Sequence, residues 1–219
     1  YRYLADRYGL QFWWPGDSRI EVIVGAILVQ ATSWHNAEKA ILSLKRAKVL
    51  DAKSLNLIRE ADLAELIYSS GYYHAKAKRI KAFSEHLWVN YKLDLDLMLR
   101  QEPLTLRQEL LTINGIGEET ADCILLYAAG WPIFVIDEYT RRMVDRLGLG
   151  PKSGTYADYQ RLFEGCLTRD VSIFNEYHAL IVALGKDVCR KEPECGRCVL
   201  SSKCIYGIEI LSKTVEGGY

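Results

Sequence analysis

Apolar residues recur along most of this chain with the spacing of an α-helix. In the segment 37–50 they follow the i, i+3, i+4, i+7 pattern of one buried helix face, formed by Ala37, Ala40, Ile41 and Leu44. The segment 156–166 repeats the pattern, with an apolar face made by Tyr156, Tyr159, Leu162, Phe163 and Cys166. Residues 21–32 are apolar nearly all round, which is typical of a helix buried in a core. No alternating strand pattern is found, so the sequence predicts an all-α fold.

Glycine and proline residues divide this pattern into about eight to ten predicted helices. The breakers are Gly71, Pro103, Gly115–Gly117, Gly130–Pro132 and Gly148–Pro151. Neither an internal repeat nor a low-complexity linker separates the segments. With 219 residues, the chain is long enough for one large domain or for two small lobes, each with a core.

The composition narrows the setting of the protein without naming a function. Lys and Arg total 28 and Asp and Glu total 28, so the formal net charge is zero. This balance argues against a uniformly basic surface that coats nucleic acid, although a local basic patch still binds phosphate. No stretch approaches the ~18 apolar residues of a membrane span, and the given residues carry no signal-peptide pattern. We therefore expect a soluble, cytoplasmic protein without membrane contact.

Residues 106–130 have the pattern of a helix, a tight Gly-x-Gly turn and a second helix. Gly115 and Gly117 permit positive φ and allow a partner to approach the backbone closely. The second helix is expected to begin near Glu118, so its free N–H groups would point toward the turn, where an anion is stabilised. An ordinary αα-hairpin is the alternative. The apolar flanks, with Ile113 before the turn and Ile116 inside it, favour a hairpin that binds a DNA phosphate.

Four of the six cysteines lie close to the end of the sequence. They are Cys189, Cys195, Cys198 and Cys204. This crowding does not match a disulfide framework and predicts a metal site instead. Four thiolates suit zinc or an iron–sulfur cluster, and the spacing alone does not choose between them. Cys123 and Cys166 are expected to be inert core residues on apolar helix faces.

The hairpin motif and the segment after it carry a family resemblance. The sequences "LLTINGIGEETADCILLYA" and "VIDEYTRR" resemble the helix-hairpin-helix DNA glycosylase superfamily, typified by endonuclease III. The likeness extends from "AILVQAT" at 26–32 to the terminal cysteines. It implies a two-lobed fold, with a six-helix lobe at 21–132 that contains the hairpin. Residues 1–20 and 133–219 would form the second lobe, which carries the metal loop at 189–204.

The resemblance also implies the catalytic residues and the partner. Asp137 corresponds to the family's aspartate, although by itself an Asp after an apolar run is most often a helix N-cap. Both roles are compatible. The cleft between the lobes would hold Asp137, Glu119 and the tryptophans, and the partner would be double-stranded DNA with a damaged base. We expect a monomer associated with the nucleoid.

The acids of the hairpin set the expected reaction. Endonuclease III places a lysine nucleophile two residues after the second hairpin glycine, where this sequence has Glu119. A carboxylate cannot form an imine, so the sequence predicts a monofunctional glycosylase that leaves the backbone intact. Helix-dipole complementarity, worth about 0.3–1 kcal/mol, is the alternative reason for acids in a first turn, and it suffices for Glu118.

The aromatic residues near the N-terminus suggest the base that is removed. By default tryptophans pack in a core, but adjacent Trp residues that end at a Pro cannot all face one core. A base-removing enzyme stacks the flipped base between flat side chains. A cationic alkylpurine would gain an estimated ~0.5–2 kcal/mol per aromatic contact. The residues in question are Trp13, Trp14, Pro15 and Trp34. Together with Glu119 they resemble the type-III 3-methyladenine glycosylase branch. The resemblance implies that Lys186 is the counterpart of that branch's pocket lysine; an ordinary surface lysine is the alternative.

Further DNA contacts follow from the resemblance. Gln30 corresponds to the residue that fills the gap left by a flipped base; a buried amide bonded to the backbone is the alternative. The hairpin contacts would be made by Ile113, Gly115, Ile116, Gly117 and Thr120. The basic run Lys76, Lys78, Arg79 and Lys81 is expected to form a solvated helix face, close to phosphate.

The cysteine spacing supports the same family and favours one cofactor. Endonuclease III carries a [4Fe–4S] cluster on a similar run, whose first gap has six residues, whereas this chain has five. From this similarity we expect a [4Fe–4S] cluster rather than zinc. The chain would then combine a type-III pocket with an endonuclease III frame. The predicted function is hydrolysis of the N-glycosidic bond of alkylated purines such as 3-methyladenine.

Two alternative functions stay open from the sequence. One is an endonuclease III-like glycosylase for oxidised or other damaged bases, with weak lyase activity from a lysine elsewhere. The other is a non-catalytic iron–sulfur protein that binds DNA. Asp137 distinguishes this non-catalytic protein from an enzyme, because a protein that only binds DNA does not need a catalytic aspartate.

Overall fold

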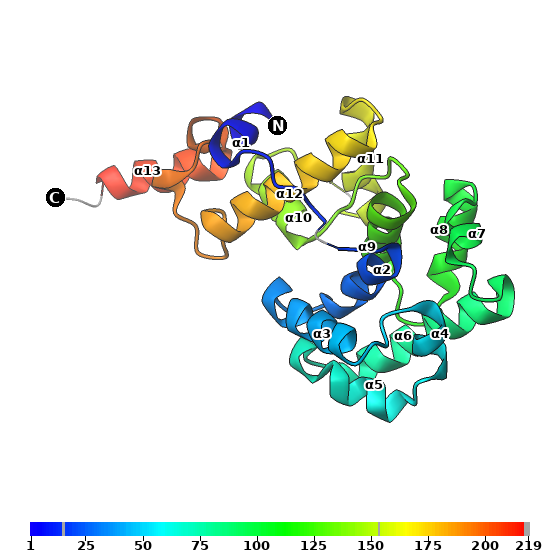
Figure 1. Ribbon diagram of the computed structural model, residues 1–219. Coiled ribbons are helices and arrows are strands. Elements are labelled where there is room, and N and C mark those ends of the chain that lie inside the picture. The colour runs from blue at the N-terminus through cyan, green and yellow to red at the C-terminus, as the bar shows by residue number, and fades with distance from the viewer. Residues whose placement is uncertain (15, 153, 217–219) are drawn as a thin grey trace. The chain divides into compact units, whose positions relative to one another are not determined.

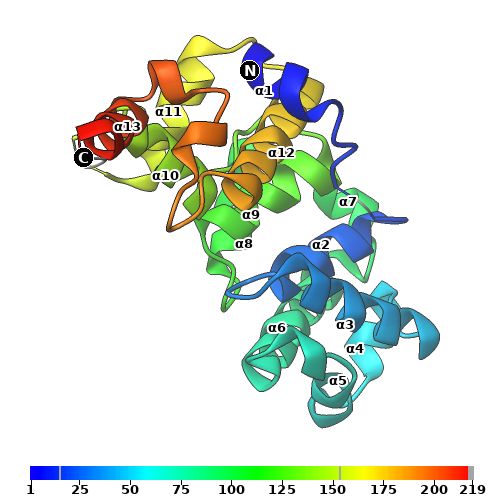
Figure 2. The ribbon, with the colours of Figure 1, turned by 90° about the vertical axis from the view of Figure 1, so that its left-hand side faces the viewer.

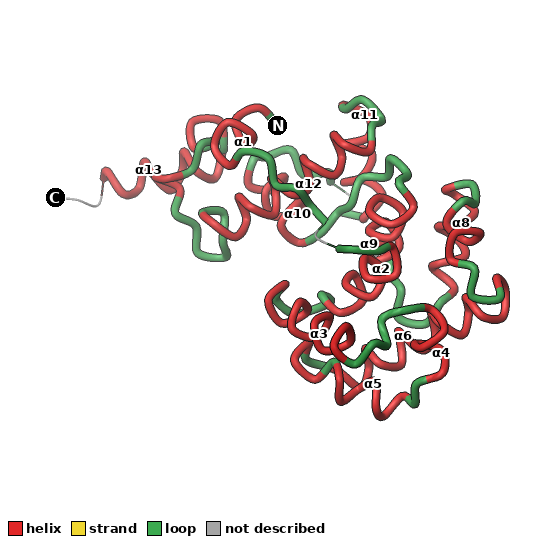
Figure 3. The backbone as a smooth tube through the Cα atoms, viewed as in Figure 1, coloured by secondary structure: helices red, strands yellow, loops and turns green. Residues whose placement is uncertain are grey.

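The computed structural model describes residues 1–14, 16–152 and 154–216, with side chains up to residue 213 in the last helix. Within these ranges the backbone forms helices and loops without a strand (Figure 3). The predicted all-α fold is confirmed. The chain divides into two compact units. We call Trp14–Trp131 the central unit, and Tyr1–Trp13 with Pro132–Tyr219 the terminal unit.

The central unit is built around the apolar helix α2. Its α-helices are α2 (Arg19–Leu28), α3 (Trp34–Arg46), α4 (Ala52–Leu57), α5 (Glu60–Leu66), α6 (Tyr73–Tyr91), α7 (Leu95–Leu99), α8 (Pro103–Thr112) and α9 (Glu118–Cys123), with short turns η1 (Tyr68–Ser70) and η2 (Ile124–Ala129). Every residue of α2 from Ile20 to Leu28 is buried, because α3, α6, α9 and η2 surround it (Figure 1). The buried face of α3 is the predicted one.

The turn η2 continues α9 as a π-helix. A π-helical turn is rare and is frequent at functional sites, because it rotates the following side chains relative to those of an α-helix. In this chain it carries Tyr127, which belongs to the candidate site described below.

The terminal unit joins the two ends of the described chain. Its helices are α1 (Arg2–Tyr8), α10 (Glu138–Arg146), α11 (Tyr156–Cys166), α12 (Val171–Asp187) and α13 (Ile205–Glu216), with short 3-10 turns η3 (Cys195–Arg197) and η4 (Ser201–Lys203). The long helix α12 packs against α1 and α10 (Figure 2). Phe134 lies in the core, stacked on Phe163 with 4.1 Å between ring centroids and edge-on to Phe174.

Three predictions need correction. The described residues form thirteen α-helices rather than eight to ten, and the central unit holds eight where six were expected. Helices such as α4 and α7 have six and five residues, too few for periodicity to reveal. Cys166 is exposed, because it ends the last turn of α11. The units divide after Trp13 and Trp131, whereas the lobe boundaries predicted at 20/21 and 132/133 stay a proposal.

None of the described helices combines the length and the apolar composition that crossing a lipid bilayer requires.

Candidate functional site

Asp137 is fixed at the start of α10 in the terminal unit. It follows the buried run Ile133–Ile136 and caps the helix, with Oδ1 accepting the Thr140 N–H at 2.7 Å. Its Oδ2 lies 3.5 Å from Nε2 of His178 on α12, and the Asp137 side chain is only 12% exposed. The cap role and a site role therefore coexist in one rigid carboxylate.

The surroundings of Asp137 keep it ionised. Burial by itself raises the pKa of this carboxyl group, but the charge and hydrogen bond of His178 and the Thr140 N–H outweigh it. The net result is a pKa below the usual value for an aspartate. Asp137 is thus an anion with one of its oxygens committed to a helix cap, held in a poorly solvated place.

Lys186 and Trp13 lie near each other in the same unit. The Lys186 Nζ is 5.6 Å from the centroid of the Trp13 ring, close enough for a cation–π interaction. Burial lowers the pKa of Lys186, and the negative charge of Asp137 opposes this decrease. Three of the residues singled out in the sequence therefore share one unit and interact.

A second aromatic group lies in the central unit. Trp14 contacts Trp34 edge-on at 5.2 Å between ring centroids, and it contacts Tyr127 at 5.3 Å with the two rings tilted. A Cβ on Gly25 would come within 3.3 Å of the Trp14 ring, so the glycine lets this ring lie close to α2. Pro15 is outside the described residues. The adjacent Trp13 and Trp14 thus contact different partners.

The Gly-x-Gly turn has one side packed and one side open. Gly115 has φ of 85°, and a Cβ there would collide with the side chain of Arg79. A Cβ on Gly117 would meet nothing within 4 Å. The side chains of Ile113 and Ile116 are buried, so any DNA contact of these two residues is confined to their backbone.

Gln30 ties the turn to the end of α2. Its Nε2 donates to the Gly115 carbonyl at 3.1 Å and to Oγ1 of the buried Thr120 at 2.8 Å, and its Oε1 accepts from Arg79. All the polar atoms of the amide group are engaged inside the central unit. The insertion of Gln30 into DNA stays a prediction and would require these bonds to be exchanged.

Glu119 lies in the first turn of α9 and is exposed. Glu118 beside it is 3.6 Å from Arg107, whose guanidinium also donates to the buried Asp122 at 2.6 and 3.1 Å. This ion pair joins α8 to α9. Glu118 therefore takes part in a salt bridge that braces the hairpin. The predicted contact of Glu119 with the reacting sugar stays a prediction.

The basic run of α6 was wrongly predicted to be a solvated face. Lys76 is buried and donates to the carbonyls of Leu28 and Ser70 at 2.9 and 2.6 Å. Lys81 is half-buried and donates to three carbonyls between residues 55 and 58. Long aliphatic stems bury readily while the ammonium satisfies helix-end carbonyls. Of this run, Lys78 is exposed.

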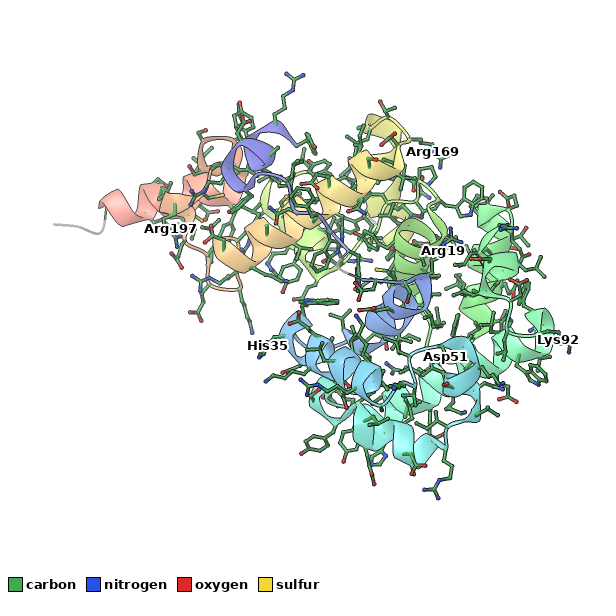
Figure 4. All side chains as sticks on the ribbon, viewed as in Figure 1. Arg19, His35, Asp51, Lys92, Arg169 and Arg197 are labelled. Carbon is green, nitrogen blue, oxygen red and sulfur yellow. The ribbon has the colours of Figure 1, made fainter. Side chains whose placement is uncertain are left out.

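The four clustered cysteines line one small cavity in the terminal unit. Arg146 donates to Sγ of Cys189 at 3.3 Å and to the carbonyls of Arg190 and Lys191, so α10 holds the start of this loop. Arg197, labelled in Figure 4, pairs with Asp187 at 3.2 Å. The described side chains contain no group of three His, Cys, Asp or Glu that could hold a metal ion, so ligation stays a prediction.

Two residues of this site were missed in the sequence. His178 is 41 positions from Asp137, and an isolated His on an apolar helix carries no signal of its partner. His178 and Gly185 are seven residues apart and therefore lie on one face of α12. A glycine on that face could have indicated that another helix packs closely against it. Tyr127 was hidden because "ILLYAA" has the pattern of an ordinary core helix.

The cleft between the lobes stays a prediction. The terminal unit contributes Asp137, His178, Lys186 and Trp13, and the central unit contributes the Trp14 group and the hairpin. The chemistry available is a buried anion, a lysine of lowered pKa, and flat aromatic faces.

Comparisons with known proteins agree with one family. Residues 24–168 match the family described as HhH-GPD superfamily base excision DNA repair protein. A Methanocaldococcus jannaschii protein named as a DNA repair glycosylase is 44% identical over 206 residues, which is 94% of each chain. Endonuclease III of Sulfolobus acidocaldarius is 29% identical, over 85% of this chain and 83% of that one.

Two solved structures are also similar. The 3-methyladenine DNA glycosylase MagIII of H. pylori, bound to 1,N6-ethenoadenine, has a TM-score of 0.70 and 27% identity, covering 80% of this chain and 87% of the other. A non-covalent endonuclease III–DNA complex has a TM-score of 0.82 at 19% identity, covering 95% and 94%, and it indicates a shared fold.

Proposed function

Because this chain belongs to the HhH-GPD superfamily of base excision DNA repair proteins, we propose that it is a monofunctional DNA glycosylase for alkylated purines such as 3-methyladenine. It binds double-stranded DNA as a monomer, flips out the damaged nucleotide, and hydrolyses the bond between C1′ and the base. The backbone stays intact until another enzyme cuts it.

The observation that carries this proposal is the state of Asp137. A carboxylate that is mostly buried, kept ionised by His178 and capped onto α10, is placed to stabilise positive charge on a sugar. As the C1′–N bond breaks, its electrons leave with the base and the sugar becomes an oxocarbenium ion. Asp137 would stabilise this cation and accept the proton of the attacking water.

The preference for a cationic base rests on the aromatic groups. An N3-alkylated adenine carries positive charge before it leaves, so it needs no strong general acid. The ring centroid of Trp14 lies 5.2 Å from that of Trp34 and 5.3 Å from that of Tyr127, so this group offers several electron-rich faces. The similarity to the H. pylori 3-methyladenine glycosylase supports this substrate class.

One observation favours a second candidate function. Lys186 has a lowered pKa in the unit that holds Asp137, and a neutral amine can attack C1′ to form an imine. The alternative is therefore a glycosylase for other damaged bases with weak lyase activity from Lys186. Borohydride trapping would distinguish the two, because only the lyase forms a covalent DNA adduct, which Lys186→Arg would remove.

For the cofactor we propose a [4Fe–4S] cluster held by Cys189, Cys195, Cys198 and Cys204. These four thiols line one cavity. Burial and the neighbouring thiols raise the pKa values of Cys195 and Cys198, so the thiolate forms would gain from a bound cation. The cluster would hold together the loop between α12 and α13 and brace the terminal unit. We expect iron and visible absorption in the purified protein, both lost in Cys198→Ser and retained in Cys166→Ser; zinc without absorption would contradict the cluster.

The substrate proposal is tested by incubating the protein with methylated duplex DNA and separating the released bases by chromatography. In parallel, strand breaks are counted with and without hot alkali. We expect free 3-methyladenine, and breaks only after alkali. Release of oxidised pyrimidines instead, or breaks without alkali, would favour the alternative.

A further inference from the structure

His178 is a buried titratable residue that faces Asp137 inside the terminal unit. Its side chain is 5% exposed, and its Nε2 lies 3.5 Å from Oδ2 of Asp137. The ring also lies edge-on to Phe134, with 6.4 Å between centroids. Around a pair this poorly hydrated, electrostatic interactions are stronger than in water.

The packing of α12 on α10 brings the two side chains together. His178 and Gly185 are seven residues apart, so they lie on the same face of α12. Gly185 touches the Tyr139 side chain so closely that a Cβ at this position would collide with it. The glycine therefore permits the close approach of α10 and α12, and His178 reaches Asp137 two turns earlier on the same face.

The two oxygens of Asp137 have different partners. Oδ1 accepts the Thr140 N–H and Oδ2 faces the imidazole. With one partner on each oxygen, the carboxylate cannot rotate without losing a contact. The second contact, from His178 to Oδ2, distinguishes an oriented general base from an ordinary N-cap carboxylate.

We propose that His178 is the positioning residue of Asp137: its Nε2–H holds the carboxylate in one orientation and keeps it ionised for the reaction. The role rests on the proposed function, in which Asp137 is catalytic. Without His178, the burial of Asp137 would favour the protonated carboxyl group, which neither stabilises an oxocarbenium ion nor accepts a proton from water.

Other charged and titratable groups lie on the helices that pack around this pair. Lys186 of α12 and Tyr139 of α10 interact electrostatically with Asp137, and Arg142 of α10 lies over the Tyr139 ring. From α1, Arg7 and Tyr8 face Asp187. Among these, Lys186 is the other cation near Asp137, so the tests include it.

The first test follows the imidazole signals of the whole chain by NMR at one pH. His178→Gln assigns the His178 signal among the four histidines. We expect the Nε2–H signal of His178 to move and to exchange faster with solvent in Asp137→Asn, because the carboxylate that faces this N–H is lost. The signal should keep its wild-type position in Lys186→Met. An unchanged His178 signal in Asp137→Asn would overturn the proposal.

The second test measures single-turnover base release against pH. In His178→Leu we expect a rate reduced about 10-fold or more and an acid limb moved to higher pH, since the pKa of Asp137 rises when its partner is lost. His178→Gln retains an N–H donor and should show a smaller shift. His35→Gln, at an exposed position in the central unit (labelled in Figure 4), is the control.

The two tests separate the two proposals. An acid limb that stays in place in a folded His178→Leu protein, checked by its melting temperature, would contradict the role of His178. A wild-type protein that releases no damaged base would contradict the proposed function, whereas the NMR result would still report whether His178 and Asp137 are coupled.

Discussion

The carboxylates of Asp137 and Glu119 both lie at the start of a helix, but they differ in how deeply they are buried. Asp137 is mostly buried, with a partner for each oxygen, whereas Glu119 is exposed in the first turn of α9. A buried, oriented anion can act on a sugar cation. In the proposed function, the exposed Glu119 matters because it stands where endonuclease III has a lysine. The amine of a lysine at this position would be a nucleophile, whereas a carboxylate cannot form an imine.

Replacement of Glu119 by lysine tests this interpretation. We expect Glu119→Lys to cut DNA at the damaged site without alkali and to be trapped on DNA by borohydride, because an amine can form an imine with C1′. The loss of an acid from a first helical turn should cost about 0.3–1 kcal/mol of stability. Glu118→Lys is the control and should form no adduct. Equal trapping of both variants, or of neither, would contradict the assigned position.

Local motifs of the site were predictable from the sequence, whereas its distant pairs were not. The N-cap role of Asp137 follows from an acid after an apolar run. Its pairing with His178 depends on how α12 packs on α10, which no local pattern encodes. The same holds for Tyr127, whose side chain direction depends on a π-helical turn.

Among the elements, length decided which helices could be predicted. The face of α3 follows from four turns of periodicity, whereas α4 and α7 contain little more than one turn each. The basic run of α6 shows the limit of charge patterns. Lys76 is buried because it satisfies carbonyls at the ends of two neighbouring elements, α2 and η1, which the sequence of α6 does not reveal.

The buried Lys76 makes stability depend on pH. Burial, and then the nearby Arg79, lower its pKa from 10.5 to about 8. Between these values the unfolded chain binds the proton more tightly, so the free energy of unfolding rises with pH. From pH 8 to 9.5 wild type should gain about 1–2 kcal/mol relative to Lys76→Met. Denaturant titrations at the two pH values measure this, with the exposed Lys78→Met as control. A constant difference would contradict the lowered pKa.

The hairpin offers two glycines with opposite expected effects. Gly115→Ala should destabilise the protein by about 1–2 kcal/mol, because φ is positive and Arg79 fills the space. Gly117→Ala should change stability by less than about 0.5 kcal/mol but weaken DNA binding, because its new methyl group faces the open side of the turn. Melting curves and binding titrations on damaged duplex DNA measure both. Unaltered DNA affinity in Gly117→Ala would argue against a phosphate contact there.

For the whole molecule, the candidate residues are found in both compact units. Trp13 contacts Lys186 in the terminal unit and Trp14 contacts Trp34 and Tyr127 in the central unit, although the two tryptophans are adjacent in sequence. A chain that crosses between units at this point can supply aromatic rings to both. The family was predictable from the hairpin motif and the all-α fold from the helical periodicity, whereas the packing inside each unit required the structure.

The most direct test of the central claim is the rate of 3-methyladenine release by Asp137→Asn under single-turnover conditions. Asn is also a good N-cap, so α10 should remain folded. The matched control is Asp170→Asn, at the exposed N-cap of α12. We predict that Asp137→Asn loses about 10²–10³-fold or more in rate, with DNA affinity within about 2-fold of wild type, and that Asp170→Asn matches wild type. Base release by Asp137→Asn at the wild-type rate would contradict the account.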